Sequence, residues 1–182
     1  MRPPEDDWSI NILEGAVRSG KTWSLHPKAI YCSCYNVGGR KIFTGVSKQS
    51  IYNNVLDDLF DIVGTRNYNY NRSTGELRLF NSEWLVIGAK DEGSERYIRG
   101  LTVGVAICDE ISLMPRSFFQ MLLTRMSPPG ARLYGTTNPD SPYHCPSSSR
   151  LDDYAHPTHS CSCHRWSHSC WRHNKGKLFP KS

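Results

Sequence analysis

The chain has 182 residues and a formal net charge of +5, hydrophobic residues make up 38% of it, and its mean hydropathy is −0.53. This length suits one ordinary domain with or without a tail, and no apolar run approaches the roughly 20 residues that cross a bilayer. The acidic stretch Glu5-Asp6-Asp7 has no apolar core behind it. We therefore expect neither a signal peptide nor a membrane protein.

The composition changes near Tyr143. Residues 1–143 carry 16 Lys and Arg against 15 Asp and Glu. Residues 144–182 carry 6 against 2, hold six of the seven His and four of the seven Cys, and contain no Val, Ile or Met. Because such a segment cannot build a packed core, we expect a folded domain over 1–143 and a disordered, Ser/His/Cys/Arg-rich tail over 144–182.

Strands and helices alternate along the predicted domain. Short apolar runs predict strands at 10–13, 41–46, 77–80, 84–87, 103–108 and 131–135. Helical patterns lie at 20–35, 51–63 and 115–126. This alternation predicts an α/β fold with a mostly parallel central sheet flanked by helices.

Two of the predicted helices have recognisable ends. Pro27 favours a break or a late start in the first helix. We expect Ser50 to cap the second helix and Gly64 to end it. The buried face of that second helix is predicted to hold Ile51, Val55, Leu59 and Ile62.

One segment fits the phosphate-loop pattern G-x-x-x-x-G-K-[ST] in full. Its glycines let the backbone curl so that N–H groups point at phosphate oxygens, and the helix that follows adds its positive N-terminal end. The lysine of this pattern reaches the β- and γ-phosphates, and the Ser/Thr hydroxyl binds Mg²⁺. The alternative is a glycine turn that happens to precede a lysine. We predict a triphosphate and Mg²⁺ site at Gly15, Ala16, Val17, Arg18, Ser19, Gly20, Lys21 and Thr22.

Polar residues follow two of the predicted strands. Asp109 suits the Mg²⁺ role of an acid at a strand end, and Glu110 is the candidate for polarising the attacking water. The alternative is an ordinary acidic pair at a helix N-terminus. Thr136-Thr137-Asn138 closes the last strand, where it either senses the γ-phosphate or forms a polar turn before Pro139.

In this order, these elements resemble the ATPase half of phage terminase large subunits, the motors that package DNA into capsids, with the greatest similarity to the PBSX-like branch. The phrases that carry the resemblance are 14–22, 96–100, 107–110 and 135–143, and together they cover about residues 8–143. The resemblance implies an incomplete P-loop NTPase fold with ATP and Mg²⁺ as cofactors. It assigns Lys21 and Thr22 to ATP and Mg²⁺, Asp109 as Walker B acid, Glu110 as catalytic base, and Thr136, Thr137 and Asn138 as the motif that couples hydrolysis to DNA movement.

The resemblance also bears on residues whose roles stay open. Arg18 either senses γ-phosphate charge or is exposed. Arg96 and Arg99 face DNA or a neighbouring subunit, or belong to a solvated loop. Trp8 stacks on adenine, or is a plain core or surface aromatic. The partners implied are double-stranded DNA, the small terminase subunit, the portal or procapsid, and further copies of this chain, in the cytoplasm of a bacterial host.

The resemblance stops after Tyr143, where terminases continue into a nuclease domain. Our hypothesis is a frameshifted or degraded gene with a non-native tail. A small zinc site is a second interpretation, and a basic tail with salt-sensitive affinity for nucleic acid is a third. The zinc ligands would be Cys161, Cys163, His164, Cys170 and His173.

Two alternatives for the function of the chain stay open. One is a catalytically weak nucleotide-binding fragment from a degraded prophage gene, and the other is another helicase-like P-loop ATPase.

Overall fold

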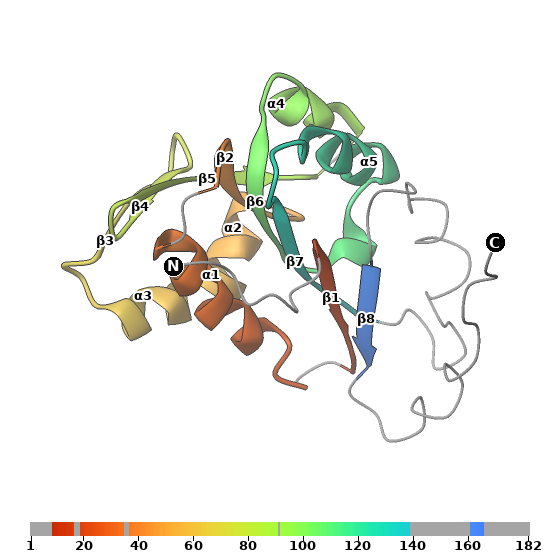
Figure 1. Cartoon of the computed structure of the whole chain (residues 1–182). Helices are drawn as coiled ribbons and strands as arrows, with labels where there is room; N and C mark the ends of the chain where they lie inside the picture. Colours follow the sequence, from red (N-terminus) through yellow and green to blue (C-terminus); the bar gives the residue numbers. More distant parts are fainter. Residues whose placement is uncertain (1–8, 17–18, 35–36, 91, 139–160, 166–182) are drawn as a thin grey trace, which may run out of the picture.

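The computed structural model describes residues 9–16, 19–34, 37–90, 92–138 and 161–165. Within these ranges the strands form one eight-stranded sheet in the order β3-β4-β5-β2-β6-β7-β1-β8 (Figure 1). The strands are β1 (Ile10–Glu14), β2 (Arg40–Gly45), β3 (Tyr68–Asn71), β4 (Glu76–Leu79), β5 (Ser82–Gly88), β6 (Val103–Cys108), β7 (Arg132–Thr137) and β8 (Cys161–Arg165).

The middle of the sheet is parallel and one edge is antiparallel. The pairs β5–β2, β2–β6, β6–β7 and β7–β1 are parallel, whereas β3–β4 and β4–β5 are antiparallel hairpins. Strand β3 was not predicted, because its Tyr-Asn alternation contains residues that strands disfavour. Its Tyr68 ring stacks on Phe60, with 3.8 Å between the ring centroids.

Helices cover both faces of the sheet (Figure 1). The first face carries α1, α2 and α3, and the second carries α4 and α5. Neighbouring residues of β2 serve opposite faces, since Phe43 packs in the first core and Ile42 in the second. The predicted α/β class is therefore confirmed. The helices are α1 (Leu25–Cys34), α2 (Lys48–Ile51), α3 (Asp57–Val63), α4 (Arg96–Arg99) and α5 (Arg116–Arg125).

Strand β7 lies between β1 and β6 in the sheet. Thr136 of β7 lies opposite Leu13 of β1, and Gly135 of β7 lies opposite Cys108 of β6. Strand β1 leads into the phosphate loop, and β6 leads into Asp109. Because the carboxyl ends of parallel strands meet at one edge, this order brings three predicted motifs together.

The helical segment after β2 begins earlier than predicted and changes pitch along its length. Ser47, rather than Ser50, is the N-cap, and each of these two serine hydroxyls accepts a hydrogen bond from the backbone N–H of the other at 3.0 Å. A π-helical segment, Tyr52–Leu56, then joins α2 to α3. The wider π turn shifts the phase of the residues after it, so that Phe60 is buried and Ile62 is 46% exposed. The rest of the predicted buried face is confirmed at Ile51, Val55 and Leu59.

The first helix starts late, as Pro27 favoured. A 3₁₀ turn, Thr22–Ser24, precedes α1, and Pro27 lies in the first turn of α1. That position tolerates proline because its missing N–H has no partner within the helix.

Of the predicted tail, the structure describes only β8, which pairs in parallel with β1. The composition of residues 144–182 did not lead us to expect a strand. Residues 139–160 and 166–182 lie outside the described ranges, so the domain boundary at 143 and the disorder of the tail stay predictions. None of the helices in the described ranges is long and apolar enough to cross a membrane.

The position of the N-cap can be tested by substitution. We expect Ser47→Ala to lower the free energy of unfolding by about 1 kcal/mol, because it removes the acceptor for the Ser50 N–H. The exposed Gln49→Ala, two residues along, is the control and is expected to change the free energy of unfolding by less than about 0.5 kcal/mol. Urea unfolding followed by circular dichroism measures both variants. Equal stability of the two variants would contradict the assigned cap.

Candidate active site

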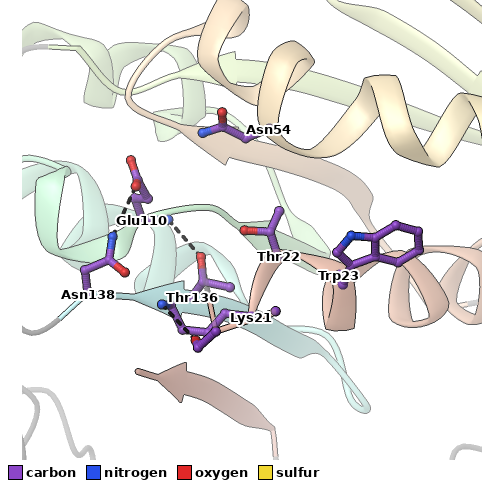
Figure 2. Close-up of a pocket in the computed structure, with 9 residues that line it drawn as sticks. Lys21, Thr22, Trp23, Asn54, Glu110, Thr136 and Asn138 are labelled. Carbon is purple, nitrogen blue, oxygen red and sulfur yellow. Dashed lines mark hydrogen bonds between the residues drawn. The ribbon is translucent and has the colours of Figure 1, made fainter. Parts of the chain in front are cut away.

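A cavity of about 360 Å³ opens at the edge of the sheet where β1, β6 and β7 end (Figure 2). The residues around it come from the phosphate loop, the 3₁₀ turn that follows it, the π-helical segment, the turn after β6, and the end of β7 with the residue after it. They are Ser19, Gly20, Lys21, Thr22, Trp23, Asn54, Glu110, Thr136 and Asn138. The cavity therefore joins all three predicted motifs.

The phosphate loop curls around the ammonium group of Lys21. Lys21 Nζ donates hydrogen bonds to Gly15 O and Ala16 O, both at 2.6 Å, and to Ser19 Oγ at 3.3 Å. Gly20 has a φ of +80°, a conformation that residues with a side chain rarely adopt. This glycine lets the chain reverse direction just before the lysine.

The lysine and the two acids lie on the same side of the sheet. Burial lowers the pKa of Lys21, and the nearby charges of Glu110 and Asp109 partly oppose that fall. Opposite charges raise the pKa of an ammonium group only over short distances. The sequence interpretation required this proximity, because a triphosphate with its metal has to lie between the loop and the acids.

Asp109 is a buried carboxylate whose two oxygens are both hydrogen-bonded. Its exposed fraction is 4%. Oδ1 accepts from Thr136 Oγ1 at 3.0 Å, and Oδ2 accepts from Asn54 Nδ2 at 2.9 Å. Burying a charge without such partners is costly, so these two bonds both stabilise the carboxylate and fix its orientation.

Glu110 has a left-handed backbone, with φ 53° and ψ 58°. A residue with a side chain in this region carries strain of about 1–3 kcal/mol, and such residues cluster at functional sites. The Glu110 N–H donates to Thr136 Oγ1 at 3.0 Å, and its Oε1 accepts from Asn138 Nδ2 at 3.2 Å. The Thr136 hydroxyl thus contacts both acids, one through a carboxylate and the other through the backbone.

Gly135 allows the turn after Glu110 to lie close against β7. A Cβ atom at Gly135 would lie 2.3 Å from Ile111 Cδ1, in the 3₁₀ turn Ile111–Leu113. A larger residue at this position would force the Ile111 side chain to move. The glycine therefore leaves room for the side chain of the residue that follows Glu110.

Sequence reasoning missed two residues that line the cavity, Asn54 and Trp23. Asn54 belongs to the π-helical segment and carries no motif, so only the structure reveals its bond to Asp109. Trp23 follows Thr22 directly and is 60% exposed. An aromatic residue directly after a phosphate loop was a signal that could have been used.

Some predicted residues lie apart from the cavity or outside the described ranges. Thr137 is buried beside Thr136 on β7 but is not among the described residues that line the cavity. Val17, Arg18 and Trp8 fall outside the described residues, as do the side chains of the predicted zinc ligands. Within the ranges that the structure describes, no group of three or more His, Cys, Asp or Glu could hold a metal ion.

Arg96 and Arg99 lie on the single turn of α4, away from the cavity. Both are exposed. Arg99 pairs with Glu95 four residues earlier, and the Arg96 guanidinium lies 5.1 Å from the centre of the Tyr97 ring. These contacts suit the solvated interpretation, and a role toward DNA or a neighbouring subunit stays a prediction.

No protein-family model and no curated protein matches the chain. Solved structures of phage large terminases, in contrast, share its fold. The large terminase from the thermophilic bacteriophage D6E matches over 81% of this chain, with 27% sequence identity and a TM-score of 0.68. The same terminase in complex with ADP matches over 80% of the chain, with 26% identity and a TM-score of 0.68.

The chain corresponds to part of the D6E terminase that it matches. The chain covers 39% and 38% of the two D6E structures, so it spans about two-fifths of that terminase. The large terminase ATPase domain from Thermus phage P74-26 matches over 74% of this chain and 61% of that domain, with 16% identity and a TM-score of 0.51, and shows the fold alone. Similarity to the PBSX-like branch stays a prediction. The predicted resemblance to the ATPase domain of phage terminase large subunits is therefore confirmed.

Proposed function

We propose that this chain is the ATPase domain of a DNA-packaging terminase large subunit and hydrolyses ATP to move double-stranded DNA. One observation carries the proposal: a single cavity is lined by the phosphate-loop lysine, the acid Glu110 and the polar end of β7. The lysine would bind the phosphates, and Glu110 would polarise the attacking water. The polar end of β7 would respond to the presence of the γ-phosphate.

Binding of the triphosphate is assigned to the loop of residues 15–22. Backbone N–H groups of such a loop and the ammonium of Lys21 supply the positive field that phosphate oxygens need. The D6E terminase, which matches this chain in fold, has been solved with ADP and with ATP-gamma-S. That precedent supports an adenine nucleotide at the corresponding place in this chain.

The oxygen atoms at and beside the cavity suit a magnesium ion, which prefers oxygen ligands. Thr22 lines the cavity and offers a hydroxyl. Asp109 does not line it, but its carboxylate is hydrogen-bonded to the lining residues Asn54 and Thr136 and its charge acts on Lys21. Both oxygens of Asp109 already accept hydrogen bonds, which suits a carboxylate that acts on the ion through bound water. When bound, the ion neutralises charge on the β- and γ-phosphates.

Hydrolysis is assigned to Glu110. In-line attack on the γ-phosphate requires a water that is oriented and polarised by a nearby base. The Asn138 amide donates to Glu110 Oε1 and thereby restrains the carboxylate. Thr136 holds the backbone of the same residue. Together these bonds keep the base in one position between turnovers.

Coupling to DNA is assigned to Thr136, Thr137 and Asn138. Two of these three residues line the cavity and contact the acids, so loss of the γ-phosphate changes the surroundings of the β7 end directly. The proposed partners are double-stranded DNA, the small terminase subunit and the portal of the procapsid, inside a bacterial host cell.

Substitutions of Lys21 and Glu110 are expected to affect ATP binding and ATP hydrolysis differently. Lys21→Ala removes a charge that contacts phosphate, so we expect loss of ATP binding and a fall in hydrolysis of about 100-fold or more. Glu110→Gln keeps the shape but loses the base, so ATP still binds while turnover falls by about 100-fold or more. Steady-state hydrolysis and equilibrium nucleotide binding measure the two effects. Equal loss of binding in both variants would contradict the assigned roles.

Thr136 is expected to matter through its hydroxyl. Thr136→Val removes the bonds to both acids at nearly constant volume, and we expect kcat to fall by about 10- to 100-fold with a smaller effect on ATP affinity. Thr136→Ser keeps the hydroxyl and is the matched control, with kcat near that of the wild type. If valine and serine gave the same kcat, the bridging role would be wrong.

A packaging ATPase is distinguished from a helicase-like ATPase by what stimulates it. We expect hydrolysis by the full chain to rise when the small terminase subunit or procapsids are added to DNA. The assay compares ATP turnover with no addition, with DNA alone, and with DNA plus each partner. Stimulation by DNA alone, with no further response to either partner, would favour the helicase-like alternative.

A further inference from the structure

The cavity has two chemically different ends (Figure 2). Glu110 and Asn138 lie at one end, Lys21 and Thr22 lie in the middle, and Trp23 lies at the other end. We propose that the indole of Trp23 is the base-stacking platform of this site and binds the nucleobase of the nucleoside triphosphate. The inference rests on the proposed function and names the part of the site that holds the nucleoside.

The orientation of the bound triphosphate follows from the position of Glu110, the proposed general base. A water polarised by Glu110 attacks the γ-phosphate, so the γ-phosphate has to lie at the Glu110 end. The phosphate chain then passes Lys21 and Thr22. Its nucleoside therefore extends toward the opposite end, where Trp23 lies.

Trp23 has the exposure that a stacking residue needs. Its side chain is 60% exposed at the rim of the cavity. Large aromatic residues gain the most when a ligand covers them, because their rings bury about 150–250 Å². A planar base laid against this ring removes apolar surface from water on both partners.

The Trp23 ring is also held in place by a contact with His26. The His26 ring meets the Trp23 ring edge-on, with 5.1 Å between centroids and an interplanar angle of 76°. His26 is 1% exposed, and its Nε2 donates to the Val55 carbonyl in the π-helical segment at 3.0 Å. Burial lowers the pKa of His26, so the ring is neutral at physiological pH. A fixed histidine thus supports the tryptophan and leaves most of its surface open.

Stacking has a consequence for specificity. Every base presents a π-face, so stacking binds bases with little discrimination between them. We therefore expect the contribution of Trp23 to be similar for adenine and guanine nucleotides. An inorganic polyphosphate has no base and gains nothing from this residue.

The test compares a nucleotide with the same phosphate chain that lacks a nucleoside. Equilibrium binding to the full chain is measured with Mg²⁺ for the β,γ-imido analogue of ATP, the corresponding GTP analogue and inorganic tripolyphosphate. We expect Trp23→Leu to weaken both nucleotide analogues by about 5- to 100-fold and to leave tripolyphosphate binding unchanged. Trp23→Phe keeps a ring and is expected to lose less. Tyr97→Leu, at an aromatic residue of α4 that is 55% exposed, is the matched control and should change none of the three.

Tryptophan fluorescence of the wild type and of Trp23→Phe gives an independent measurement. We expect the ATP analogue to quench tryptophan emission in the wild type, and that quenching to disappear in Trp23→Phe, because the stacked indole is the affected one. Tripolyphosphate should cause no such quenching in either protein.

The outcomes separate the two proposals. If Trp23→Leu bound the nucleotide analogues as tightly as the wild type, the stacking role would be wrong. An equal loss of affinity for the analogues and for tripolyphosphate would also overturn it, because that result marks an effect on the phosphate loop itself. If the wild type bound neither the analogues nor tripolyphosphate, the proposed nucleotide-binding function would fail first.

Discussion

The hydroxyl of Thr136 is the interaction on which the rest of the site depends. It donates to Asp109 Oδ1 and accepts from the Glu110 N–H, both at 3.0 Å. A hydroxyl carries one hydrogen and two lone pairs, so it can make both bonds at once. One side chain therefore fixes the carboxylate of the first acid and the left-handed backbone of the second. The strain at Glu110 persists because the surrounding contacts determine its conformation.

This interaction depends in turn on the order of the strands. If β1 and β6 were neighbours, the phosphate loop would adjoin the acids directly and no third strand could end between them. With β7 inserted, its last residues lie opposite Leu13 on one side and Cys108 on the other. Gly135 then leaves room for the Ile111 side chain against β7. The strand order thus places the Thr136 hydroxyl where it can contact both acids.

How much could be predicted from the sequence depends on whether the residues of the site are neighbours in the chain. The phosphate loop was predictable because its geometry is encoded by glycines within eight consecutive residues, and Asp109 was predictable because it ends an apolar strand. Asn54 was not, because its direction depends on a π-helical segment that has no simple sequence signature. The same wide turn misled the prediction for Ile62, which helical spacing had assigned to the buried face. The strand order also escaped prediction, since it is set by packing between distant segments.

The two halves of the site are held by different kinds of partner. Asp109 and Glu110 are held by side chains from β7, from the residue that follows it and from the π-helical segment, whereas Lys21 is held by the carbonyl oxygens of its own loop. A hydrogen bond with one ionised partner is roughly twice as strong as a neutral one, so the bonds of the Lys21 ammonium to these carbonyls are already of the strong kind. In the function that we propose, charged phosphate oxygens take the place of these carbonyls as partners of the lysine, whereas Asp109 and Glu110 already have side-chain partners. The change of partners that nucleotide binding requires therefore falls on the lysine, and the acids at the ends of β6 and β7 keep the partners that they have.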